Sequence, residues 1–117
     1  MCKCIAPHEG EELMLVEEGI KPLAIIYHSK SPKLYREACR SLSCKRTLVR
    51  AGVIAIAQDQ QTIRAYIGLV SNRKSYTREQ YQRCMGKLLG YSNHEVEEFI
   101  QSEIGKTCTC IECGGEI

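Results

Sequence analysis

Cysteine is the residue type whose placement in this chain most clearly indicates chemistry. Five of the eight cysteines lie at the two ends of the 117-residue chain. Thiolate sulfur is a preferred ligand of zinc, and four converging cysteines make the closed tetrahedral sites that zinc occupies in a structural role. A link between the ends, through a metal or a disulfide, would also remove loop-closure entropy from the unfolded chain. We therefore predict a metal site that joins the termini, with ligands drawn from Cys2, Cys4, Cys108, Cys110 and Cys113.

The strongest part of this pattern is the pair Cys110 and Cys113, which is followed by two glycines. This short segment is similar to the zinc knuckle of zinc ribbons and rubredoxin-like sites, where glycine permits a tight turn. An iron–sulfur cluster is the alternative, but neither common cluster spacing is present, so zinc is favoured. The favoured ligand set is Cys2, Cys4, Cys110 and Cys113, with Cys108 or His8 as a substitute.

Composition indicates one soluble domain that spans residues 1–117. The hydrophobic content of 44% is ordinary for a globular chain of this length. No run of apolar residues is long enough to cross a membrane, and the first residues lack the basic and apolar parts of a secretory signal. We expect a cytoplasmic protein, where reducing conditions favour metal-bound or reduced cysteines over disulfides.

The three cysteines away from the ends fall into two classes. Cys39 and Cys84 lie in predicted helices, and we expect both to be small buried core residues. Cys44 precedes Lys45 and Arg46 directly, and nearby positive charge stabilises a reactive thiolate. A thiol or redox enzyme that uses Cys44 or the terminal cysteines is therefore an alternative function. Because the sequence places no histidine beside Cys44 as a base, a non-enzymatic role is favoured.

Charge is distributed unevenly along the chain. Residues 30–50 hold seven lysines and arginines but one glutamate, whereas residues 1–20 and 92–117 are both acidic. Helical spacing places Lys33, Arg36 and Arg40 in one arc. Such an arc suits phosphate or carboxylate, so the expected partner is nucleic acid, a nucleotide or an acidic protein; an ordinary solvated helix face is the alternative. The predicted partner-binding residues are Lys33, Arg36, Arg40, Lys45 and Arg46, and Arg73, Lys74, Arg78 and Arg83 would extend the basic surface if they packed nearby.

Two stretches of the sequence predict strands. Residues 51–68 hold two runs of strand-forming residues on either side of the polar turn around Asp59, which is typical of a β-hairpin. The first run is apolar on both faces, as in a central strand, and the second alternates. The apolar run Leu23–His28 predicts a third strand, with Pro22 just outside it.

Three helices follow from capping signals and apolar stripes. Ser31 and Pro32 begin a helix to Leu42, and capping boxes at Thr77 and Ser92 begin helices at residues 78–89 and 93–104. Residues 11–18 fit either a helix or a strand. The last two helices have the spacing of a helix-turn-helix, but the second carries four glutamates that phosphate would repel, so we interpret the pair as a packed hairpin.

Together these patterns predict an α+β fold, in which a small antiparallel sheet of three or more strands packs against about three helices. The predicted function is a small metal-binding, regulatory or binding module with a basic surface. The sequence does not identify the partner or the oligomeric state.

Overall fold

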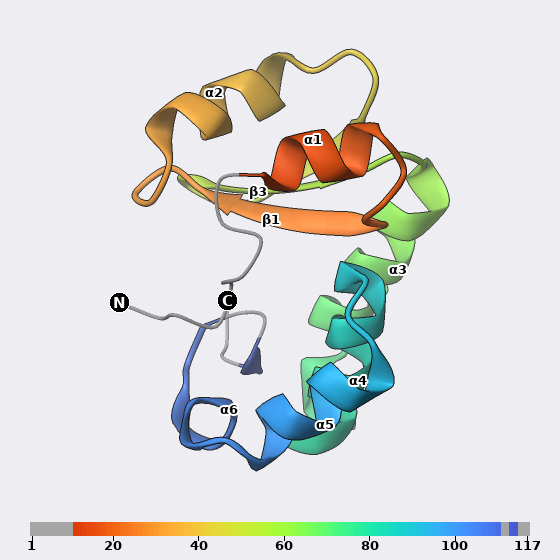
Figure 1. Ribbon diagram of the computed structural model, residues 1–117, viewed down its shortest axis with the longest axis vertical. Helices are drawn as coiled ribbons and strands as arrows, with labels where there is room; N and C mark the ends of the chain where they lie inside the picture. Colours follow the sequence, from red (N-terminus) through yellow and green to blue (C-terminus); the bar gives the residue numbers. More distant parts are fainter. Residues whose placement is uncertain (1–10, 111–112, 115–117) are drawn as a thin grey trace.

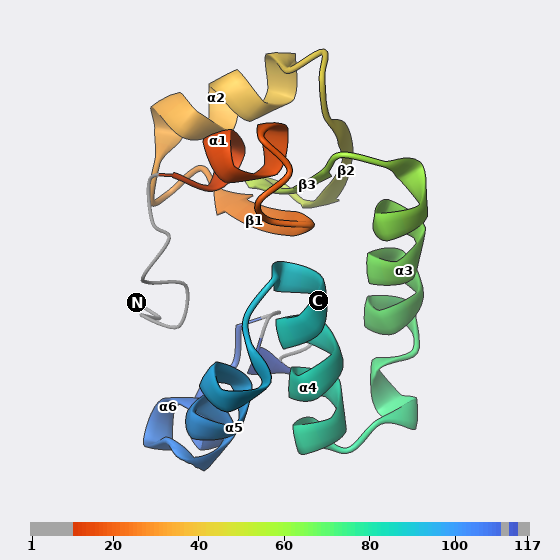
Figure 2. The ribbon, with the colours of Figure 1, turned by 45° about the vertical axis from the view of Figure 1, so that its right-hand side comes forward.

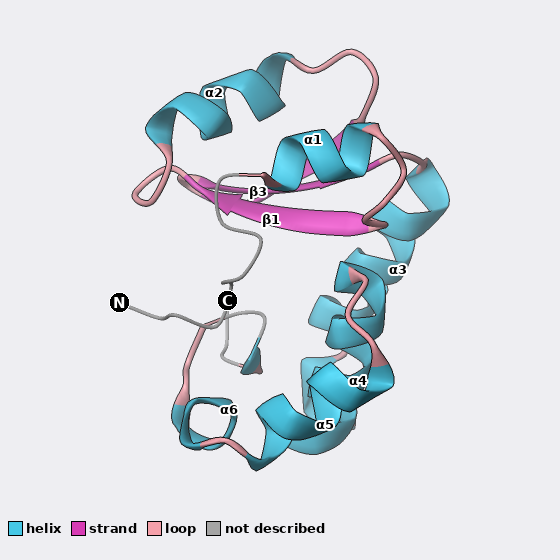
Figure 3. Cartoon of the chain, viewed as in Figure 1, coloured by secondary structure: helices cyan, strands magenta, loops and turns pink. Residues whose placement is uncertain are grey.

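A three-stranded antiparallel sheet separates two layers of helices (Figure 1, Figure 3), so the predicted α+β class is confirmed. The computed structural model describes residues 11–110, 113 and 114. The strands are β1 (Leu23–Tyr27), β2 (Lys45–Arg50) and β3 (Val53–Ala57), in the order β1-β3-β2. The helices are α1 (Glu12–Glu17), α2 (Pro32–Arg40), α3 (Gln60–Ser71), α4 (Arg78–Leu89), α5 (Asn93–Gln101) and α6 (Glu103–Thr107), with a 3-10 turn, η1, at Arg73–Ser75.

The central strand β3 is buried along its whole length, as its apolar sequence predicts. It pairs with β1 on one side and β2 on the other, with Ala55 opposite Ile25 and Thr47. Side chains of a strand alternate between the two faces, and each face here has its own core. Ile54 and Ile56 pack under α1 and α2, whereas Val53, Ala55 and Ala57 pack against α3 and α4.

The layer of α3 and α4 extends away from the sheet and leads to α5 and α6 at the far end of the molecule (Figure 2). The larger core lies in this layer, where Tyr66 of α3 and Tyr81 of α4 are almost fully buried. Helices α4 and α5 pack so closely that a Cβ on Gly86 would lie only 2.4 Å from Val96 Cγ2. This contact confirms that the two helices pack against each other, as the hairpin interpretation requires.

The predicted hairpin at residues 51–68 is wrong in its second half. Residues 60–71 form α3, because the Asp59 carboxylate caps the helix by accepting from the Thr62 N–H at 2.7 Å. The apolar residues also fit a helical period, and Ile63, Tyr66 and Leu69 all face the core. The real hairpin joins β2 to β3 through a turn at Gly52, whose φ of 77° is left-handed. Strand β2 was missed because its basic residues look like a solvated segment.

The helix predictions hold with two corrections. Helix α2 ends at Arg40 rather than at residue 42, and Leu42, the predicted last residue of the helix, is 100% exposed. The predicted helix 93–104 divides at Ser102, which has extended backbone and whose hydroxyl accepts from the Gly105 N–H at 3.0 Å to cap α6. Helices α1, α3 and α6 were not among the three predicted, and the open segment 11–18 is helical at Glu12–Glu17.

None of the helices in the described part of the chain is long and apolar enough to span a membrane.

Candidate metal centre

Three cysteines that follow α6 lie together. We call Cys108, Cys110 and Cys113 the cysteine cluster, and their Sγ atoms all lie within 4.8 Å of one another. Cys113 is buried and the other two are half-buried. Tetrahedral zinc with Zn–S bonds of about 2.3 Å requires sulfur atoms roughly 3.8 Å apart, so small side-chain movements would allow the cluster to coordinate one ion.

The other two predicted ligands, Cys2 and Cys4, lie outside the described residues, as does His8. The structure therefore places the possible metal site near the C-terminal end of the chain, and the joining of the two termini stays a prediction.

The backbone around the cluster has the turn that the two glycines after Cys113 suggest. The Cys113 N–H donates to the Cys110 carbonyl at 3.1 Å, and the Cys108 N–H donates to the Ile104 carbonyl at 2.8 Å. Gly114 has a φ of 101°, a left-handed conformation that glycine adopts without steric cost. A Cβ at this position would also lie 2.9 Å from Arg73 Nη2. A side chain here would therefore strain the backbone and displace the end of the Arg73 side chain.

Gln82 of α4 holds the backbone on both sides of the cluster. Its side chain is buried, and its Nε2 donates to the Gly105 carbonyl at 2.6 Å and to the Cys113 carbonyl at 2.8 Å. A side-chain amide nitrogen has two hydrogens, so both donors are used. One residue of α4 thereby sets the positions of the backbone before and within the cysteine cluster.

Two arginines reinforce this arrangement. Arg78, one turn before Gln82, donates to the carbonyls of Gly105 and Cys108. Arg73 donates to the Gly114 carbonyl at 2.8 Å, and its guanidinium lies over the Tyr81 ring, 4.7 Å from the centroid. Positive charge beside cysteine thiolates offsets their negative charge, and a metal site with several thiolate ligands needs such an offset.

Sequence reasoning missed these roles, since it assigned Arg73 and Arg78 to an extension of the basic surface. Both side chains are instead half-buried and bind carbonyl groups. The Arg83 side chain is also engaged within the protein. It forms a two-point ion pair with Glu97 of α5, from Nε to Oε2 at 2.8 Å and from Nη2 to Oε1 at 3.0 Å. The one signal in the sequence is that Arg78 and Gln82 share a helix face, but nothing in it shows that the cysteine segment lies across that face.

Cys39, Cys44 and Cys84, the other cysteines within the described residues, do not gather into a second thiol cluster. Cys44, predicted as a reactive thiol, is 5% exposed and packs in the core under α1 and α2. Cys39 is half-buried beside the same core, as expected, whereas Cys84 is exposed, so its predicted burial is wrong. All three are free thiols. The burial of Cys44 does not favour the nucleophile hypothesis, because a reactive thiolate needs access to its substrate.

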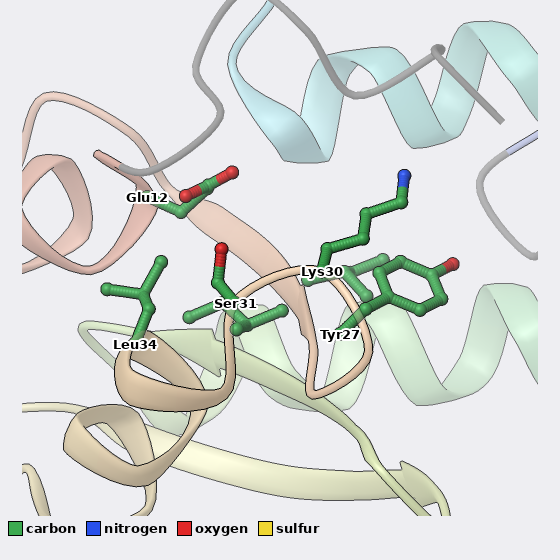
Figure 4. Close-up of a pocket in the computed structure, with 7 residues that line it drawn as sticks. Glu12, Tyr27, Lys30, Ser31 and Leu34 are labelled. Atoms are coloured by element: carbon green, nitrogen blue, oxygen red, sulfur yellow. The ribbon is translucent and has the colours of Figure 1, made fainter. Parts of the chain in front are cut away.

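A small hollow lies between α1 and the start of α2, lined in part by Glu12, Ser31 and Leu34 (Figure 4). Its volume is about 10 Å³, which is no more than one water molecule needs. Lys30 lies beside it, with its ammonium 5.3 Å from the centroid of the Tyr27 ring. This hollow is therefore too small for an organic substrate.

The five predicted partner-binding residues are all exposed. We call Lys33, Arg36, Arg40, Lys45 and Arg46 the basic surface. The first three lie on α2 and the last two begin β2. Arg46 Nη1 donates to the Ser41 carbonyl at 2.7 Å, so the start of β2 lies beside the end of α2. Arg46 therefore lies near the end of α2, on the face of the sheet that α1 and α2 cover, whereas Lys45 belongs to the opposite face.

Comparison of the chain with protein-family models, with curated proteins and with solved structures found no match in any of the three. The functional argument therefore rests on the site itself.

Proposed function

We propose that this protein is a non-enzymatic zinc-binding module that engages an acidic or phosphate-bearing partner. The observation that carries the metal part is the convergence of three cysteine sulfurs on a backbone that Gln82, Arg73 and Arg78 hold in place. A cluster of thiols held by neighbouring side chains is what a metal site needs, because the ligands do not have to be ordered by the ion alone.

The proposed ion is zinc, with Cys108, Cys110 and Cys113 as ligands and a fourth thiolate from Cys2 or Cys4. Four thiolates would leave no open position for a substrate, so the role of the ion would be structural. Zinc would hold the cysteine segment in the conformation in which its carbonyls accept hydrogen bonds from Arg78 and Gln82 of α4. Because ligands converge only in the folded chain, binding of the metal would stabilise that fold.

The partner part of the proposal rests on the basic surface. Five exposed cations on two consecutive elements would attract an acidic protein, a nucleotide or a nucleic acid. Glu37 of α2 lies within these elements, and Glu17 of α1 lies beside their connection, where it accepts hydrogen bonds from Ser41 and Ser43. Five cations against these two carboxylates would still leave the surface with a positive balance.

Elemental analysis of protein purified without air tests the metal part. We expect about one zinc per chain, as a closed thiolate site requires. Replacement of Cys110 by serine should abolish stoichiometric zinc, while Cys84→Ser, which removes an exposed cysteine outside the cluster, should leave it unchanged. Equal zinc content in the wild-type protein and the Cys110→Ser variant would contradict the proposal.

The same preparation distinguishes the alternatives. Iron with acid-labile sulfide and a brown colour would replace zinc by an iron–sulfur cluster and favour a redox function. Substitution of cobalt for zinc would report the number of thiolate ligands through the visible spectrum. If the Cys2→Ser or the Cys4→Ser variant has one thiolate ligand fewer than the wild-type protein, the replaced cysteine is the fourth ligand. If neither variant differs from the wild-type protein, the N-terminal cysteines are not ligands.

A further inference from the structure

The edge of the sheet beside the basic surface is open. Strand β2 is at the margin of the sheet, and among residues 11–110 it pairs with β3 alone. The outer side of such a strand presents backbone N–H and C=O groups that can pair with another chain. Edge strands of this kind are used to bind extended peptides by strand addition.

One face of β2 is also uncovered. Helices α1 and α2 pack over β1 and β3, as Figure 1 shows, and leave Leu48 64% exposed on that face. Leu42, in the connection between α2 and β2, is 100% exposed. Thr47 and Val49, which are directed to the opposite face, are partly buried toward α3. The edge therefore offers the apolar side chain of Leu48 on the same face as the basic residue Arg46.

The charges on β2 indicate which kind of strand can pair with its outer edge. Lys45, Arg46 and Arg50 are all exposed, and the strand has no acidic residue. A second copy of β2 would bring like charges into opposition, which destabilises strand pairing. An acidic strand would make favourable cross-strand pairs with the same residues. The charges thus oppose self-association and favour an acidic peptide.

Nucleic acid fits this surface less well. Single-stranded nucleic acid is usually bound by exposed aromatic rings on which bases stack. Tyr35, the aromatic residue of α2, packs against the core, with its ring 5.3 Å from that of His28. The exposed leucines and the open backbone edge have no complement in a phosphate backbone, whereas an extended peptide with alternating side chains complements both.

We propose that β2 binds an extended acidic segment of a partner protein, which adds to the sheet as a fourth strand. Carboxylates of the partner would face Lys45, Arg46 and Arg50, and an apolar side chain would cover Leu48. This inference rests on the partner part of the proposed function and specifies its chemistry. It does not depend on the metal.

Selection from a display library of random peptides of about eight residues, the length of a typical strand, tests this inference. The target is the metal-replete full-length protein. We expect the enriched peptides to carry two adjacent acidic residues, which would face Lys45 and Arg46 on opposite sides of the sheet. An apolar residue two positions from the acidic residue that faces Arg46 would cover Leu48. Enrichment of peptides without acidic residues would overturn the inference.

Two matched double variants locate the site. Reversal of charge in Lys45→Glu/Arg46→Glu should weaken the selected peptides by about tenfold or more, because two cross-strand attractions become repulsions. Lys33→Glu/Arg36→Glu changes the net charge equally but lies on α2, and it should weaken them by less than about threefold, as screened charges at a distance do. Equal losses in the two variants would show general charge attraction and contradict strand addition.

Backbone methylation tests the pairing itself. In an extended peptide, alternate N–H groups point to opposite edges. Methylation of one alternate set should abolish binding while methylation of the other set preserves it, and equal effects of the two sets would contradict strand addition.

Binding of a fluorescent single-stranded oligonucleotide of mixed sequence tests the alternative that the basic surface binds nucleic acid. If it binds and both double variants weaken it while no acidic peptide is enriched, the strand proposal fails and the basic surface is a nucleic-acid site. If neither probe binds, the partner part of the proposed function fails as well, and elemental analysis still decides the metal part.

Discussion

The α2–β2 region and the cysteine cluster both use arginine, but they use it in different ways. Arg36 and Arg40 are exposed on α2, where water surrounds their charges. Arg73 and Arg78 are half-buried beside the cluster and donate to carbonyl groups of the chain. The comparison teaches that a count of charges along the sequence does not measure a binding surface, because packing removes some of those charges from the surface.

Removal of the proposed metal should have the largest effect on this comparison, because the proposed function places the ion at the cysteine cluster and not at the α2–β2 region. Bound zinc would stabilise the folded state by about 4 kcal/mol when free zinc is roughly a thousandfold above its Kd. We expect chelation to lower the melting temperature in thermal unfolding followed by circular dichroism.

Hydrogen exchange on the same samples would show where the effect lies. Protection should fall at Cys108 and Cys113, while the amides of β2 change little. Equal loss of protection in both regions, or no change in melting temperature, would contradict a local structural role of the ion.

Replacement of Gln82 by leucine should have the next largest effect. The variant leaves the Cys113 carbonyl without the donor from Gln82, whereas the Gly105 carbonyl keeps its hydrogen bond from Arg78. A buried unsatisfied polar group costs about 1–3 kcal/mol. Loss of such an outer partner should also weaken zinc binding by about tenfold or more. Gln101→Leu changes an exposed glutamine of α5 and serves as the control. Competition with a chromophoric chelator measures the affinity, and an unchanged value in Gln82→Leu would show that α4 does not position the ligands.

Substitution of Gly114 by alanine adds one carbon atom beside the cysteine cluster and tests how closely the chain packs there. The left-handed φ of 101° and the nearby Arg73 guanidinium together predict a loss of about 1–3 kcal/mol. Gly68→Ala is the matched control, because it lies within α3 with open space around its Cβ position. That change should stabilise the protein by about 0.5–1 kcal/mol, as alanine does in a helix. Urea denaturation measures both, and effects of the same sign would contradict this account.

The ion pair between Arg83 and Glu97 should give the smallest effect, since both side chains are about half exposed. The hydrogen bond from Arg83 lowers the pKa of the Glu97 carboxyl below its ordinary value. Glu97 therefore stabilises the fold above its ordinary pKa, and this contribution disappears as the pH falls through the lowered value. In Arg83→Gln protein we expect the pKa to rise toward the ordinary value, as NMR titration of the carboxyl would show. An unchanged pKa would mean that the pair does not form in solution.

The accuracy of the sequence predictions differed between elements for physical reasons. Helix α4 was predicted with its bounds, because a capping box at Thr77 and Gly90 at its end are both local signals. Helix α3 was predicted as a strand, because Ile63, Ala65 and Ile67 satisfy a period of two as well as a helical period. Strand β2 was missed because an edge strand tolerates charged residues that would be excluded from the centre of a sheet.

The candidate site was predictable in the same partial way. Cysteine spacing and the glycines after Cys113 identified the possible ligands, since these features depend on a few neighbouring residues. The roles of Arg73, Arg78 and Gln82 were not predictable, because each acts on a carbonyl that is 23 or more residues away in the sequence.

By itself, the sequence determined the apolar central strand, the capped helices, the basic segment and the cysteines that can converge. These properties depend on composition and on contacts within a few residues. Only the tertiary structure decided that Cys44 is buried, that Cys84 is exposed, and that α4 holds the backbone of the cysteine cluster. Those outcomes depend on which elements pack against one another, and hydrophobic burial around β3 settles that packing for the whole domain at once.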